Sequence, residues 1–368
     1  MDSVVSSPNS VLANALGQVE DVLTPYLRAA RPKRVELCVG TQINGVPHIG
    51  TSLVQALTFA LAARLRDRHQ VRVQVAFTAL DNAPHESVQD PASGHIYQRA
   101  LAHAFNPATV DRQIDSLYRP LFDALSSRAA VSYRLETYTQ QQAGPGFRMT
   151  WLRLLPRIEA ARWWLAPPTG TPHLRVPCPA AGCGWAEKHA ERTTVRPGQD
   201  QAATVAAVCL QHGPYDVVIR TGGGGYLDLS TLYRNLVKEL AVQLTPDTLT
   251  VMIKGADWMP GTLLVNGALT AAGLTPGQIP ARVFCPQIVT ATGAKLSKSL
   301  IREGRAEPMD LGDEWMLDTR KWPGSPDSYA ARLLDTATVL LSHPRHFFRD
   351  YSAQEIARLM ETRSVHAR

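Results

Sequence analysis

Two short segments, far apart in the chain, contain residue types that suit the binding of a nucleotide. The first is GVPHIGTSL, residues 45–53, where His48, Gly50 and Thr51 lie between an apolar run and a helical pattern. A helix N-terminus presents free backbone N–H groups and the positive end of the helix dipole, and both attract phosphate. Gly50 leaves room for a ligand near the backbone. A histidine beside a glycine in a turn is nevertheless more often structural, so this segment alone predicts little.

The second segment is TGAKLSKSL, residues 292–300, in which Lys295 and Lys298 flank Ser297. Two lysines on a glycine-containing loop can bring positive charge to a polyphosphate. Such charge stabilises a transition state in which pyrophosphate is leaving. The plain alternative is a solvated basic turn.

A third group of residues has the spacing of a metal site. Cys178 and Cys183 form a C-x4-C pair, and Cys209 and His212 form a C-x2-H pair. The chain has five cysteines, an odd number, which favours a metal site over a set of disulfides. Three thiolates and an imidazole would make a closed, structural zinc site. The alternatives are unrelated cysteines or an eroded zinc ribbon, and His189 is a spare ligand candidate.

The pattern of apolar residues predicts how these segments are positioned. Residues 35–39 are predicted to form a buried strand, and leucines at i+4 spacing from residue 53 to 65 predict a helix with one apolar face. Residues 71–80 are predicted to be the next strand, which completes a βαβ unit. Further strands are predicted in LTVMIKGADW and ARVFCPQIV. In such sheets ligands bind at the carboxyl ends of the strands.

Three acidic or amide side chains and one glycine run remain to be interpreted. Asp257 in KGADWMPG follows a predicted strand and could accept hydrogen bonds from ribose hydroxyls, or it could cap a loop or helix. Asp81 and Asn82 end the strand predicted at residues 71–80 and would face the same crevice. The four glycines at residues 222–225 indicate a flexible loop; they lack the context of a phosphate-binding P-loop.

Taken together, HIGT and KLSKS resemble the two signatures of the class I aminoacyl-tRNA synthetases, usually written HIGH and KMSKS. The closest resemblance is to the class I lysyl-tRNA synthetases, whose first signature likewise departs from a second histidine. The similarity covers roughly residues 33–300 and includes FTALDN, the cysteine segment and IKGADW. Outside the signatures it is loose.

The resemblance implies a reaction in which an amino-acid carboxylate attacks the α-phosphate of ATP, with Mg²⁺ as cofactor. Thr51 takes the place of the second histidine, and its hydroxyl can donate a hydrogen bond but carries no charge. The catalytic residues implied are His48, Thr51, Lys295 and Lys298. The ATP-binding residues implied are Gly40, His48, Gly50, Asp257, Lys295, Ser297 and Lys298. The candidates for amino-acid binding are Asp81, Asn82 and Asp228.

The fold class predicted is α/β, with a Rossmann-like parallel sheet, a zinc-ribbon-like insertion and a short helical C-terminal tail. The first half of the catalytic domain is predicted at residues 1–165, with a mainly helical stretch from 95 to 165. The insertion is predicted at 166–225, the second half of the domain at 226–300, and the tail at 301–368. The family's usual anticodon-binding domain does not fit in a tail of that length, which favours a truncated paralogue.

The predicted function is therefore an ATP-dependent ligase that forms an aminoacyl-adenylate and passes the acyl group to an acceptor. The acceptor could be a tRNA, as in a lysyl-type synthetase, or a non-tRNA amine or other small molecule of specialised metabolism. A nucleotidyltransferase and a non-catalytic synthetase-like binding protein are the alternatives from other classes. The chain is 45% hydrophobic, has no apolar run long enough to span a bilayer and shows no secretory signal, so a cytoplasmic protein without a membrane partner is expected. The net charge of +6 distinguishes none of these functions.

Overall fold

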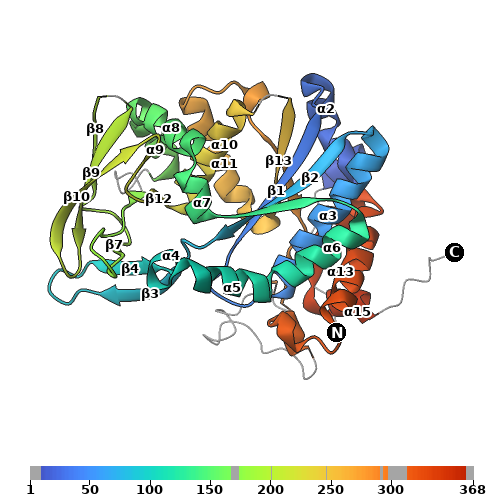
Figure 1. The fold of residues 1–368 in the computed structure, drawn as a ribbon. Helices are drawn as coiled ribbons and strands as arrows, with labels where there is room; N and C mark the ends of the chain where they lie inside the picture. The colour runs from blue at the N-terminus through green and yellow to red at the C-terminus, as the bar shows by residue number, and fades with distance from the viewer. Residues whose placement is uncertain are drawn as a thin grey trace.

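A computed structural model describes residues 10–166, 174–199, 201–245, 247–290, 293–296 and 313–361. Its centre is a five-stranded sheet in which all the strands are parallel, with helices on both faces (Figure 1). The order across the sheet is β14 (Ala281–Cys285), β13 (Thr248–Gly255), β1 (Arg34–Gln42), β2 (Arg72–Leu80) and β5 (Tyr133–Thr137). This confirms the predicted α/β class, and four of the five strands lie where apolar runs predicted them.

The predicted βαβ unit is β1, α3 (Ile49–His69) and β2. The leucines at 53, 57, 61 and 65 are all buried in the main core, as their spacing predicted. The helix begins at His48, whose imidazole accepts a hydrogen bond from the backbone of Gly50, and it ends at Gln70 in the left-handed conformation. The leucine spacing therefore predicts the buried face of this helix correctly.

The stretch from 95 to 165 is mainly helical, as expected, but it also contains two strands. β5 lies at the edge of the central sheet, and β4 (Ile96–Ala100) joins β3 (Pro84–Gln89) and β7 (Trp185–Glu187) in a small antiparallel sheet. The helices of this stretch are α4 (Leu101–Ala104), α5 (Pro107–Leu117), α6 (Arg119–Ala129), α7 (Tyr138–Ala143), α8 (Pro145–Leu154) and α9 (Ile158–Leu165).

The cysteine-containing insertion is built on a four-stranded antiparallel sheet that lies beside α8 and α9 (Figure 1). Its strands are β8 (Thr194–Pro197), β9 (Ala202–Cys209), β10 (Gly213–Arg220) and β11 (Gly223–Gly224), and β6 (Leu174–Arg175) pairs with β12 (Asp228–Leu229). Val205 and Ile219 from this sheet share a second hydrophobic core with Trp151 and Leu236 of the flanking helices. The insertion is thus packed into the body of the protein.

The glycine run is a clamped turn, which corrects the flexible loop predicted for it. Gly224 has φ +99° and pairs with Ile219, and a Cβ on it would lie 2.0 Å from the carbonyl oxygen of Val218. The buried guanidinium of Arg148 donates hydrogen bonds to the carbonyl oxygens of Gly223 at 2.7 Å and Gly225 at 3.0 Å. Only glycine can make so close an approach between two backbones.

The C-terminal segment is helical, as predicted, but it belongs to the main core. α13 (Pro326–Leu341) packs against α3 and α6, and β16 (Tyr351–Ser352) pairs with β15 (Ile288–Val289) just after the central sheet. The remaining helices are α1 (Ser10–Ala15), α2 (Thr24–Ala30), α10 (Thr231–Ala241), α11 (Met259–Ala271), α14 (Pro344–Phe347) and α15 (Ala353–Glu361). Among the described residues, no helix has the length and hydrophobicity to cross a membrane.

Candidate active site

A cavity of about 900 Å³ opens at the carboxyl ends of β1, β2 and β13. This is the edge of a parallel sheet at which ligands bind. The predicted residues that line it are Gly40, His48, Gly50, Thr51, Asp257 and Lys295. The fold therefore brings together three segments of the chain, and more than 200 residues separate the first segment from the last.

His48 is held in one orientation by the start of α3. Its Nδ1 accepts a hydrogen bond from the backbone N–H of Gly50 at 3.2 Å, and its Nε2 lies 3.3 Å from Oγ1 of Thr51. Because Nδ1 is an acceptor, the proton of the neutral imidazole is on Nε2. This nitrogen can donate to Thr51 or to a bound anion, and the hydroxyl proton of Thr51 can then be donated elsewhere.

Two of the predicted glycines have close neighbours at the cavity wall. A Cβ on Gly50 would lie 3.0 Å from Cε1 and 3.1 Å from Nδ1 of His48, so a side chain would press on the imidazole. A Cβ on Gly40 would lie 3.0 Å from the carbonyl oxygen of Thr78, its partner on β2. Both positions keep the backbone open to the cavity.

Asp257 and Lys295 both line the cavity and form an ion pair. Nζ of Lys295 lies 2.5 Å from Oδ2 of Asp257, and both side chains are partly exposed. Asp257 follows β13, and Lys295 forms an isolated antiparallel bridge with Val289. Of the other residues predicted for this loop, Ser297 and Lys298 lie outside the described residues.

The three residues predicted to bind the amino acid lie behind the cavity and do not line it. Nδ2 of Asn82 donates to Oδ1 of Asp228 at 2.7 Å, and Arg175 forms an ion pair with Asp228 at 3.1 Å. Asp81 accepts a hydrogen bond from the backbone N–H of Thr139 at 3.0 Å, and burial raises the pKa of its carboxyl above the ordinary value. All three are buried and already have partners within the protein.

This buried network reaches the cavity through Arg234, which sequence reasoning missed. Nη1 of Arg234 donates to Oδ1 of Asn82 at 3.3 Å, and its guanidinium lies over the ring of Tyr138. Burial lowers the pKa of Arg234 from its ordinary value. Lys238, one helical turn further along α10, also lines the cavity and donates to Oγ1 of Thr78 at 3.4 Å. Their i+4 spacing in the sequence was the available signal.

Lys254 on β13 and Gln55 on α3 also line the cavity and were missed. Lys254 donates to Oε1 of Glu239 at 3.2 Å, and Arg282 binds the other oxygen of the same carboxylate. Burial lowers the pKa of Lys254 below its ordinary value. Gln55 is 1% exposed, and its amide oxygen and nitrogen have no hydrogen-bond partner among the described residues.

The predicted metal ligands converge, with their ligand atoms all within 4.8 Å of one another. The sulfur atoms of Cys183 and Cys209 are 3.5 Å apart, and Nδ1 of His212 lies 3.5 Å from the sulfur of Cys178 and 3.6 Å from that of Cys209. Zinc–sulfur bonds of about 2.3 Å at tetrahedral angles place sulfur atoms roughly 3.8 Å apart. The spacing therefore fits a tetrahedral ion, and the cysteines are not disulfide-bonded.

His189 does not belong to this cluster. It lines a separate hollow with His95, Glu187 and Glu191, and Nδ1 of His95 lies 3.2 Å from Glu187 and 3.3 Å from Glu191. The spare-ligand role suggested for His189 is therefore not supported by its position.

Comparison with protein-family models and with curated proteins found no match. Solved structures that the fold resembles include the methionyl-tRNA synthetase of Mycobacterium tuberculosis bound by methionyl-adenylate, with 14% identity over 91% of this chain and 69% of that one and a TM-score of 0.45. A glutamate tRNA ligase of Elizabethkingia meningosepticum is 11% identical over 88% of this chain and 68% of that one, with a TM-score of 0.39. The arginyl-tRNA synthetase of Thermus thermophilus is 13% identical over 92% and 64% of the two chains, with a TM-score of 0.35.

Proposed function

We propose that this protein is an ATP-dependent ligase that activates an amino acid as an aminoacyl-adenylate. The observation that carries the proposal is the convergence of His48, Asp257 and Lys295 on one cavity at the carboxyl ends of parallel strands. These residues come from the two segments that resemble the class I signatures and from the strand between them. A basic turn or a structural histidine would not by itself bring the three segments to one site.

The reaction proposed is an in-line displacement. A carboxylate oxygen of the amino acid attacks the α-phosphorus, the new P–O bond forms, and the bond to the bridging oxygen breaks so that pyrophosphate leaves with its electron pair. No protein nucleophile is required, because positioning and charge stabilisation can supply the catalysis. In this proposal Nε2–H of His48 and the N-terminus of α3, where His48 caps the helix, bind phosphate oxygens.

Lys295 has a second role in this proposal. Its ammonium is paired with Asp257 at 2.5 Å. A polyphosphate carries more negative charge than one carboxylate, so the ammonium is expected to exchange Asp257 for the phosphates. Asp257 is then available to ribose hydroxyls or to Mg²⁺, which would neutralise charge on the phosphates when bound. Ser297 and Lys298 are assigned to the same loop by resemblance alone.

Zinc is proposed as a structural ion bound by Cys178, Cys183, Cys209 and His212. A closed set of four ligands leaves no position for a substrate, so the ion would stabilise the insertion and take no part in the reaction.

Amino-acid-dependent exchange of labelled pyrophosphate into ATP tests the activity. Lys295→Ala should lower the exchange rate about 100-fold, the order found when one transition-state donor is removed. Lys33→Ala is the matched control, because Lys33 forms a similar pair with Asp247 at 2.8 Å at the amino ends of β1 and β13, away from the cavity. Exchange with none of the amino acids, with or without tRNA, would refute adenylate formation. Where exchange occurs, transfer of labelled amino acid to bulk tRNA or to small amines identifies the acceptor.

A further inference from the structure

The charges that line the cavity are unbalanced. Among the described residues that line it, the cationic side chains are Arg234, Lys238, Lys254 and Lys295, and the one carboxylate is that of Asp257. Asp257 is paired with Lys295. The remaining three cations come from α10 and β13, on the side of the sheet that α10 covers.

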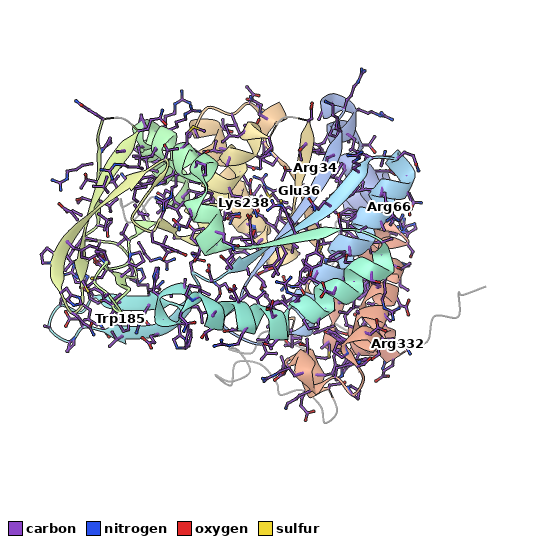
Figure 2. The ribbon with its side chains drawn as sticks, viewed as in Figure 1. Arg34, Glu36, Arg66, Trp185, Lys238 and Arg332 are labelled. Atoms are coloured by element: carbon purple, nitrogen blue, oxygen red, sulfur yellow. The ribbon has the colours of Figure 1, made fainter. Side chains whose placement is uncertain are left out.

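Arg234 and Lys238 lie one turn apart on α10, so both face the same side of the helix. Neither has a carboxylate oxygen within 4.0 Å among the residues that the structure describes. Lys238 is half-buried and labelled in Figure 2, and its ammonium donates to Oγ1 of Thr78 on β2, between α10 and the central sheet. Like charges at this spacing repel each other, and burial increases the repulsion. Two such cations facing a cavity are the arrangement expected where an anion binds.

Lys254 adds to the excess of positive charge. Its partner Glu239 is fully buried and is shared with Arg282, so one carboxylate faces two cations. The other acidic groups nearby are engaged as well, because Asp228 is paired with Arg175 and Asp81 with the backbone of Thr139. A substrate ammonium group in this part of the cavity would therefore meet cations and no unengaged carboxylate of the described residues.

We infer that the amino acid activated in this cavity has an acidic side chain, aspartate or glutamate, whose carboxylate is bound between Arg234 and Lys238. This inference rests on the proposed function, and it departs from lysine, the substrate that the sequence resemblance suggests. Arg234 is held in position by Asn82, so the buried network of Asn82 and Asp228 orients the guanidinium without contacting the substrate. That role explains why two residues predicted from sequence to bind the amino acid lie behind the cavity wall.

The test is pyrophosphate exchange with each of the standard amino acids, measured on the full chain. Exchange that depends on aspartate or glutamate supports the inference. Exchange with lysine, arginine or a neutral amino acid overturns it and leaves adenylate formation standing. Exchange with none of them refutes adenylate formation instead, so the two failures are distinct.

A second measurement locates the anion site. Lys238→Gln should raise the KM for the acidic amino acid about 10-fold or more, the effect of losing a hydrogen bond to a charged group, and leave the KM for ATP unchanged. Lys33→Gln is the control and should alter neither constant. An equal rise in the KM for ATP would show that Lys238 binds phosphate, which contradicts the inference.

Binding can also be followed without catalysis. Glutamate or aspartate should raise the melting temperature of the wild-type protein, lysine should not, and the increase should be lost in Lys238→Gln. The shift in melting temperature therefore shows whether the cavity binds an acidic amino acid even if no exchange is seen. Stabilisation by lysine, or equal stabilisation of the wild type and the variant by glutamate, would overturn the inference.

Discussion

Replacing Glu239 by Gln should destabilise the protein severely. The Glu239 carboxylate is 0% exposed and accepts from two buried cations, Lys254 and Arg282, whose side chains are 11% and 7% exposed. A glutamine has the same shape but no charge, so both cations would remain buried without a counter-charge. Breaking a buried pair in this way costs about 3–5 kcal/mol of the free energy of unfolding.

Urea unfolding followed by tryptophan fluorescence measures the loss. The matched control is Glu159→Gln, since Glu159 also pairs with an arginine, Arg162, but its side chain is 69% exposed. That change should cost at most about 1 kcal/mol, as for other surface pairs. Adding Arg282→Met to Glu239→Gln should recover part of the loss because only one unpaired cation would remain. If Glu239→Gln costs no more than the control, the electrostatic account of this side of the cavity is wrong.

Four further changes have defined outcomes. Gly50→Ala should displace the His48 ring, which a Cβ would approach to 3.0 Å, and raise the KM for ATP about 10-fold with little change in melting temperature. Gly224→Ala should cost at least about 2 kcal/mol in urea unfolding, because its φ is +99° and the new Cβ would meet the Val218 carbonyl, whereas Ala at Gly213, φ +70° with open space, should cost less. Burial raises the pKa of Asp81, so the folded state holds its proton more tightly than the unfolded state. The free energy of unfolding of the wild type should therefore fall as pH rises from 3.8 through the folded pKa, and Asp81→Asn should lack this contribution to the pH dependence. Metal analysis should find one zinc per chain, and a strong chelator should lower the melting temperature; less than half an equivalent would contradict the proposed structural ion.

The sequence predicted the parts of the fold that repeat at short range. Leucines at i+4 spacing define the buried face of α3, and runs of β-branched residues define β1, β2 and β13. β5 was missed because its sequence, YRLET, is half polar and lies at the edge of the sheet. An edge strand has one neighbour and needs fewer apolar side chains than a central strand.

The candidate site was predictable where its chemistry lies in the backbone and in local motifs. His48 and Gly50 lie at the start of a helix that follows a predicted strand, and Lys295 lies after a later strand. Whether a residue lines the cavity or lies behind its wall depends on tertiary packing. The sequence therefore predicted that Asp81 ends a strand but could not predict that its side chain is buried behind the wall. The importance of Arg234 was likewise hidden, because it depends on which carboxylates the other described elements bring within its reach.

The packing of α13 on α3 has a consequence for any attempt to isolate a minimal catalytic unit. The signature segments end near residue 300, yet Leu333 and Leu340 of α13 are buried in the same core as Leu57 and Leu61 of α3. A fragment cut at residue 300 would leave that side of α3 in water, and α3 is the helix whose first residues hold His48. The smallest active fragment should therefore extend through α15, and limited proteolysis that removes the segment after residue 326 should abolish nucleotide binding together with folding.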